Sequence, residues 1–289
     1  MPQSKVLKFL TRRSIVGVCL TSLALSMTSC GVLGPRPDST LVSLAGQALK
    51  DSHTWADSSP RLAKLRGTQA ERLLAEIARD CGTYQDGRIL QDCQLDNDQV
   101  ESHGIEQSPE DSFDTMVASI DDTSQGSRDL ITDLAFNFGH QLLADSTTDG
   151  NDAAKELPQP PALPTKDQDE ATTLLQQEYS TIWGLDSVQG FSSANALPSL
   201  SSLGDCHRHS SAALEQAFQL AKKTAPEAAP GYQIPAEKIP ADTHAAQDFA
   251  VALQQNSAQE WKKAMSLAKD DAWRLWLTRT AIVLDQCSQ

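Results

Sequence analysis

Residues 168–190 run QDEATTLLQQEYSTIWGLDSVQG, and this stretch decides the fold class of the chain. Leu174, Glu178 and Ile182 follow one another at intervals of four, so they share one face of a helix. The same helical spacing of apolar residues recurs through nearly the whole chain, and strand-type alternation of β-branched residues is missing. The sequence therefore predicts an all-α protein.

Residues 168–289 are expected to form a bundle. The apolar pattern predicts helical segments at about 168–190, 199–224, 241–267 and 270–286. Four helices joined by short connections favour an antiparallel four-helix bundle.

The preceding part of the chain predicts a separate helical region over residues 30–143. Its expected helices lie at about 38–50, 60–80 and 109–143, the last broken near Gly126. Residues 144–167 carry several prolines and acids with almost no bulky apolar residue, which is typical of a linker.

The first residues, MPQSKVLKFLTRRSIVGVCLTSLALSMTSCG at Met1–Gly31, predict an export signal over residues 1–29. Basic residues precede an uncharged block whose apolar core, about a dozen residues, is shorter than the ~20 that span a bilayer. Small residues precede Cys30 and Gly31 follows it, which resembles the bacterial lipobox. We expect cleavage before Cys30 and a lipid on its thiol. An uncleaved membrane anchor is the alternative.

Two export routes remain open. The segment Thr11–Val16, TRRSIV, is similar to the twin-arginine motif for export of folded proteins, and adjacent arginines also occur in ordinary signal peptides. Either route predicts a protein on the outer face of the cytoplasmic membrane or elsewhere in the cell envelope.

Charge limits the partners of the mature chain. Without residues 1–29 the chain keeps 20 of its 24 Lys and Arg and all 38 Asp and Glu, a net charge of −18. Such a surface repels nucleic acid and anionic lipid headgroups. The expected partners are the membrane, through the lipid on Cys30, and an envelope protein.

The cysteines agree with an oxidising compartment. The mature chain keeps an even set besides Cys30, which predicts two disulfides without fixing how they pair. Cys81 and Cys93 flank a short stretch that can turn back on itself, so we expect that local bond and a second one between Cys206 and Cys287. In an up-down-up-down bundle the last two residues would lie toward opposite ends, which leaves the second bond the weaker expectation.

An acidic run ahead of residue 102 superficially resembles a calcium-binding loop. Val100 and Glu101 occupy positions where that loop needs an oxygen ligand and a glycine, so we expect a solvated loop instead.

Short motifs in the last 120 residues resemble an actinobacterial ferritin-like domain of unknown function. They are LLQQEY with IWG at 174–184, CHRH at 206–209, PGYQIP at 230–235, and ALQ with a tryptophan at 252–261. The resemblance covers about residues 168–287 and implies a fold rather than an activity.

A ferritin-like bundle implies a metal hypothesis, which the sequence does not support. A di-metal site in such a bundle takes Glu-x-x-His motifs from two helices, and no histidine of this chain has an acid three residues before it. By the family pattern Gln254 replaces a third-helix Glu, and Tyr179 replaces a histidine. We therefore expect no metal, no cofactor and no catalytic residue.

Glu178 and His207 are the remaining polar residues on inward helix faces. A carboxylate and an imidazole on neighbouring helices offset each other's desolvation, so we expect a buried structural pair. A small-molecule site at the same place is the alternative.

The sequence also lacks the motifs of serine hydrolases, phosphate-binding loops, dinucleotide-binding folds and zinc proteases. We expect a non-catalytic binding or interaction lipoprotein of the envelope. A ferritin-like enzyme or ligand-binding protein using Glu178 and His207 is the alternative.

Overall fold

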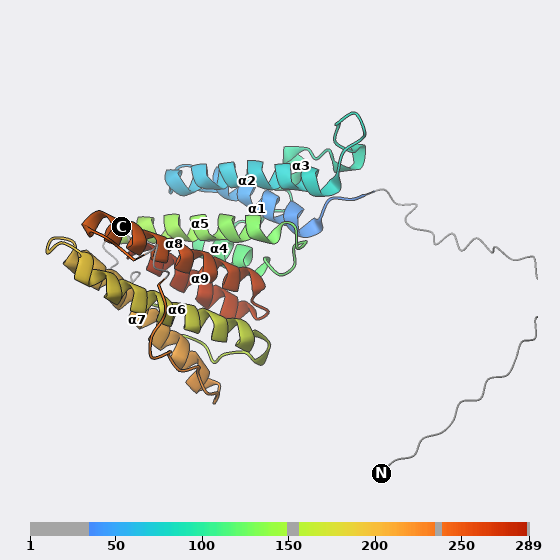
Figure 1. Ribbon diagram of the computed structural model, residues 1–289. Coiled ribbons are helices and arrows are strands. Elements are labelled where there is room, and N and C mark those ends of the chain that lie inside the picture. The colour runs from blue at the N-terminus through green and yellow to red at the C-terminus, as the bar shows by residue number, and fades with distance from the viewer. Residues whose placement is uncertain (1–34, 149–155, 235–238, 288–289) are drawn as a thin grey trace, which may run out of the picture. The chain divides into compact units, whose positions relative to one another are not determined.

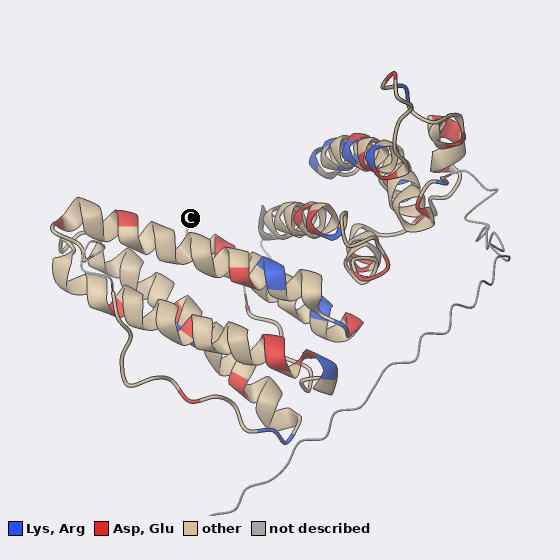
Figure 2. Cartoon of the chain, turned by 45° about the vertical axis from the view of Figure 1, so that its right-hand side comes forward, with Lys and Arg blue, Asp and Glu red and all other residues tan. Residues whose placement is uncertain are grey.

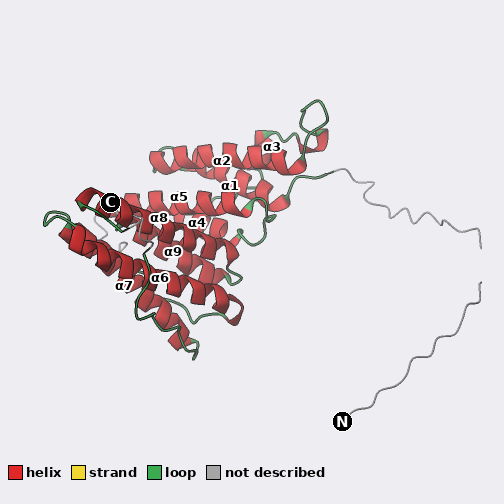
Figure 3. Cartoon of the chain, viewed as in Figure 1, coloured by secondary structure: helices red, strands yellow, loops and turns green. Residues whose placement is uncertain are grey.

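The computed structural model describes residues 35–148, 156–234 and 239–287. Within these ranges the regular structure is helical, apart from one isolated β-bridge between Thr83 and Ile89 (Figure 3), which confirms the all-α prediction. The α-helices are α1 Ser39–Thr54, α2 Pro60–Cys81, α3 Asn97–Glu101, α4 Pro109–Ala118, α5 Arg128–Thr148, α6 Gln168–Val188, α7 Leu197–Leu220, α8 Thr243–Leu267 and α9 Asp271–Gln286.

The helices stack as pairs. Figure 1 shows α1 with α2, then α4 with α5, then α8 with α9, and finally α6 with α7, and the contacts between elements follow the same order. The described residues from Pro35 onward belong to one compact unit. Its larger apolar core runs from Leu41 in α1 to Leu284 in α9, and a smaller apolar cluster joins the end of α6 to the first turns of α7 and α8. The helices of the predicted N-terminal region therefore share their core with the bundle.

The bundle helices α6 to α9 do not alternate up and down along the chain. Glu178 of α6 contacts His207 of α7, while Leu185 and Val188 of α6 cluster with Leu200 and Leu203, so α6 and α7 are antiparallel. The same comparison makes α8 antiparallel to α6, and α9 antiparallel to α8. It follows that α7 and α8 run parallel.

A long crossover makes this parallel pair possible. Residues 221–234 leave the end of α7 and lie along α6, where Pro226 accepts a hydrogen bond from the Tyr179 hydroxyl (3.2 Å) and Tyr232 packs on Trp183. The Thr243 hydroxyl at the start of α8 then meets the Phe191 carbonyl beyond the end of α6. The described parts of the connection thus follow α6 to its far end, whereas the sequence predicts short connections between helices that alternate in direction.

The described end of the predicted linker packs on the bundle. The Leu163 N–H donates to the Ala217 carbonyl (3.0 Å), and the Trp276 indole N–H donates to the Pro158 carbonyl (2.9 Å). Leu163 is also part of the apolar core. Residues 156–167 therefore act as a strap across α7 and α9.

The expected solvated loop contains α3. Asp96 caps this helix by accepting a hydrogen bond from the Asp98 N–H, and Val100 is buried. Gly46 of α1 lies so close to Gly104 that a Cβ on either residue would strike the backbone of the other segment. The acids therefore begin a short helix, because the close approach of two glycines lets it pack on α1.

Charged residues lie over the helices with acids in excess (Figure 2). No helix in the described ranges is long and apolar enough to cross a membrane.

Candidate functional site

The centre of the bundle holds a fully buried polar cluster around Glu178. Glu178 of α6 and His207 of α7 have no exposed surface, and the Nδ1 of His207 lies 2.8 Å from Oε2 of Glu178. The structure thus brings together the two residues singled out by their inward positions in the sequence.

Every acceptor position of the Glu178 carboxylate is used. Oε2 accepts from His207 and from the Ser210 hydroxyl (2.8 Å), while Oε1 accepts from the Ser257 hydroxyl (2.7 Å) and the Trp261 indole N–H (2.9 Å). A carboxylate has about four acceptor positions, so no oxygen is left for a further ligand. Burial alone would raise the pKa of Glu178, but the His207 charge and these hydrogen bonds hold it below its usual value.

The second ring nitrogen of His207 is also bonded. Its Nε2 lies 2.7 Å from Oε1 of Gln254, whose amide nitrogen faces the Leu284 carbonyl at 3.4 Å. Both ring nitrogens therefore donate, as in an imidazolium. Burial lowers the pKa of His207, but the Glu178 carboxylate and the two hydrogen bonds outweigh it, so the pKa lies above its usual value. The cluster is a buried ion pair.

These residues do not fit a di-metal centre. Such a centre in a helical bundle takes several inward carboxylates and histidines, whereas the core here offers Glu178 and His207, each bonded to the other, and a neutral Gln254. Across the described ranges no three His, Cys, Asp or Glu side chains gather as a metal site would require.

A groove of about 1360 Å³ opens beside this cluster, and Gln254 forms part of its floor. It lies between the first turns of α7, the outer face of α8, and the end of α9. Its charged members have partners within the protein: Lys262 binds Asp133 at 2.9 Å, and His244 binds Asp248 at 2.9 Å. The rest of the lining mixes two kinds of side chain. Hydroxyls and amides come from Ser193, Asn195, Ser199, Ser202, Gln247, Gln255 and Gln259, and apolar side chains come from Phe136, Ala196, Pro198, Leu200, Leu203, Ala250, Val251 and Ala258.

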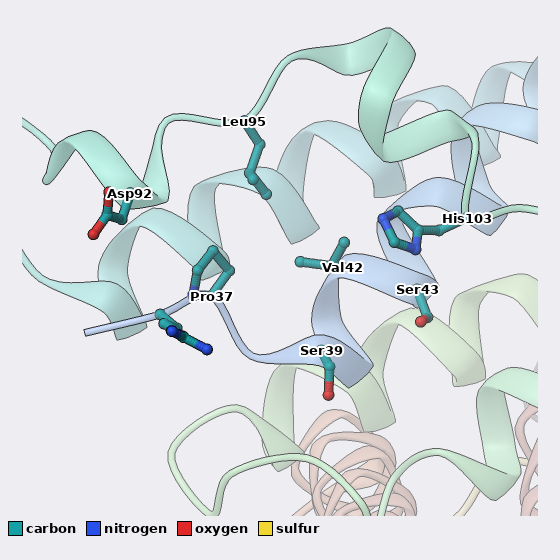
Figure 4. A pocket seen from close by; sticks show the side chains of 8 residues that line it. Pro37, Ser39, Val42, Ser43, Asp92, Leu95 and His103 are labelled. Atoms are coloured by element: carbon teal, nitrogen blue, oxygen red, sulfur yellow. The ribbon is translucent and has the colours of Figure 1, made fainter. Parts of the chain in front are cut away.

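A second, smaller hollow of about 640 Å³ lies at the start of α1. Figure 4 shows Pro37 and Ser39 on one side of it, with Asp92, Leu95 and His103 on the other. It is the described feature nearest to the predicted lipid site in the chain. Cys30 itself, with the rest of the predicted signal peptide, lies outside the described residues.

The cysteines lie in the two pairs that the sequence analysis favoured. Cys81 and Cys93 are bonded with their Cα atoms 6.3 Å apart, and Cys206 and Cys287 are bonded at 6.5 Å. The crossover explains the second pair, because it makes α9 antiparallel to α7. The end of α9 therefore meets the first half of α7, rather than its opposite end.

A second buried ion pair was not found from the sequence. Arg66 of α2 is fully buried, and its Nε donates to Asp51 of α1 at 2.9 Å. The same guanidinium donates to Gln69 (2.6 Å), and the Ser112 hydroxyl donates to Asp51 (2.5 Å). Burial lowers the pKa of Arg66, and Asp51 opposes that shift. In the sequence Arg66 resembles the other basic residues of its segment, so no local signal marks it.

The comparisons with known proteins concern the bundle. No curated protein matches this chain. The crystal structure of a conserved hypothetical protein, rv2844, from Mycobacterium tuberculosis is similar, with 23% identity over 44% of this chain and 97% of that chain and a TM-score of 0.38. Residues 171–287, which hold the Glu178 cluster and the groove, match the model of a domain of unknown function (DUF4439).

Proposed function

We propose that this protein is a cell-envelope lipoprotein, tethered through Cys30, that acts as a non-catalytic binding or interaction protein. The observation that carries the proposal is the saturation of the Glu178 carboxylate by four internal donors. A group in this state fixes the packing of three helices and has no free position for a substrate. In this proposal the bundle is an actinobacterial ferritin-like scaffold, and binding takes place on its surface.

The groove over Gln254 is the binding surface that we propose. Its volume of about 1360 Å³ is about twice that of the hollow at the start of α1, and its charged side chains are already paired within the protein. A partner would therefore meet uncharged hydroxyls and amides together with apolar side chains, among which Val251 is 55% exposed.

Site-specific photocrosslinking in intact cells tests the groove. A photoreactive residue at Val251 should give a discrete adduct, and the same residue at exposed Asp129 of α5 should not. Equal adducts from both positions, or none from Val251, would contradict a binding groove.

The tether is tested separately. Cys30→Ser should release the protein or leave it unprocessed, whereas the parent should carry an acyl group detectable by mass spectrometry. A Cys30→Ser variant that is processed and still partitions into detergent would refute lipidation.

A ligand-binding function at the cluster itself is the second candidate, because Gln254 joins the groove floor to His207. Elemental analysis of the purified protein, with Gln254→Ala as the comparison, tests it. A stoichiometric metal that is lost in that variant would favour this candidate over a scaffold.

A further inference from the structure

The chain enters the described structure beside the disulfide-closed loop. The carbonyl oxygen of Pro35 lies 3.7 Å from Sγ of Cys93, and Pro37 faces Asp92 across the hollow in Figure 4. Cys30 precedes Pro35 by five residues, which span at most about 18 Å when extended. A lipid on Cys30 would therefore hold this end of the molecule close to the bilayer.

The loop between Cys81 and Cys93 presents apolar side chains at that end. Tyr84 is 45% exposed and Ile89 is 37% exposed. A backbone hydrogen bond from Tyr84 N–H to the Arg88 carbonyl (2.8 Å) shapes the loop, and the Arg88 guanidinium lies over the Tyr84 ring. Tyrosine with an adjacent basic residue is typical of side chains at a membrane interface.

The exposed side of α2 leads into this loop and is the second part of the same face. Arg61, Lys64, Arg72 and Arg79 are exposed there at helical spacing, together with the acids Glu71 and Asp80. Two of these basic side chains already have acidic partners, since Arg79 pairs with Glu76 and Arg61 lies 4.0 Å from Asp145. With the loop's exposed charges, Asp86, Arg88 and Asp92, five basic and four acidic residues leave the face a net charge of +1, in a mature chain of net charge −18. Figure 1 shows α2 in the outermost layer of helices.

We propose that this face, the exposed side of α2 and the Cys81–Cys93 loop, rests on the lipid bilayer that carries the tether. The loop inserts Tyr84 and Ile89 among the headgroups, and Lys64 and Arg72 of α2 lie over anionic lipid. The groove over Gln254 is lined mainly by residues of α7 and α8, with Phe136 from α5, and by none from α2 or the Cys81–Cys93 loop. The inference depends on the proposed lipid tether.

Fluorine NMR of the lipid-modified mature chain tests the contact. The protein has three tyrosines, so incorporation of 3-fluorotyrosine gives signals from Tyr84 and, within the bundle, Tyr179 and Tyr232. In phosphatidylcholine–phosphatidylglycerol vesicles with a gadolinium-chelating lipid, we expect broadening of the Tyr84 signal beyond that of the other two. Equal broadening, or a sharp Tyr84 signal, would overturn the proposal.

Charge variants test whether Tyr84 approaches the lipid because the basic residues of α2 bind it, or only because the loop is close to the tether. Lys64→Glu with Arg72→Glu should lower the Tyr84 broadening about fivefold or more, because each basic residue at an anionic surface is worth roughly that factor in binding. Lys222→Glu with Lys263→Glu is the matched control in the bundle and should leave it unchanged. Equal effects of the two pairs, or none from the first, would refute the basic face as a lipid contact.

Mass spectrometry of the same samples shows whether the lipid tether or only the bilayer contact has been refuted. A chain without an acyl group refutes the tether and this inference together. An acylated, vesicle-bound chain whose Tyr84 signal stays sharp refutes only the inference, as would a Tyr84 contact that requires an added envelope protein.

Discussion

Each half of the molecule buries one ion pair, but the two pairs have different cations. In α1 and α2 the cation is Arg66, which keeps its charge over the whole range in which proteins fold. In the bundle it is His207, whose usual pKa is near neutrality. The first pair joins α2 to α1 and the second joins α7 to α6. In both pairs the charged groups are also hydrogen-bonded to neighbouring polar side chains. The difference predicts that only the bundle pair makes stability depend on pH near neutrality.

The largest difference in stability between the two halves is expected from their disulfides. The Cys206–Cys287 bond closes 81 residues and the Cys81–Cys93 bond closes 12. In the chain-entropy account these closures are worth about 4.5 and about 2.8 kcal/mol. Replacing both members of each pair by Ser should therefore lower the free energy of unfolding more for the bundle bond, as measured by urea titration. Equal losses would show that loop length does not govern these bonds.

Breaking the arginine pair should cost about 3 to 5 kcal/mol. Arg66→Met leaves the buried Asp51 carboxylate without its cation, and an uncompensated buried charge is strongly destabilising. Arg61→Met is the control on the same helix, because its side chain is 75% exposed, and should change stability by less than about 0.5 kcal/mol. A loss from Arg66→Met as small as that of the control would mean that Asp51 finds another partner.

Breaking the histidine pair should cost less, about 1 to 3 kcal/mol. Glu178→Ala leaves His207 buried, but the imidazole can lose its proton near neutral pH, whereas Arg66→Met leaves a buried carboxylate with an uncompensated charge. His207→Ala and the double variant complete a cycle. We expect the double loss to be smaller than the sum of the single losses. Additive losses would contradict the direct contact.

The smallest effect is a pH dependence confined to the bundle pair. The pKa of His207 is raised above 6.5, so its stabilisation is complete below that value and is lost as pH rises through the folded-state pKa. The pKa of Glu178 is lowered below 4.5, so its stabilisation is lost only on strong acidification. The pair therefore stabilises most between about 4.5 and 6.5.

The parent protein should lose unfolding free energy as pH rises above the pKa of His207, by about 1.4 kcal/mol for each unit by which that pKa is raised. His207→Gln should remove this loss. Unfolding free energies at about pH 6 and pH 9 measure the effect. Arg66→Met provides the comparison, since it should lower both values without changing their difference. A parent protein with no decline between these two pH values would contradict the imidazolium.

The two pairs also differ in how far the sequence revealed them. Glu178 and His207 stand on otherwise apolar helix faces, where a charged residue must be buried, and that position identified them. Arg66 belongs to a helix whose exposed face carries Arg61, Lys64 and Arg72, so its burial depends on how α2 rotates against α1. Composition and periodicity therefore do not distinguish the buried Arg66 from the three exposed basic residues of the same helix.

Helical periodicity by itself determined the helices, because each turn places its apolar residues on one side and needs no distant information. The helix α3 was missed because it is held by the close approach of Gly46 and Gly104, which are far apart in sequence. The direction of α8 and the strap over residues 156–167 were decided only by tertiary structure. Loop length and polarity do not tell whether a connection turns back or crosses the bundle, since burial of the facing helix surfaces makes that choice.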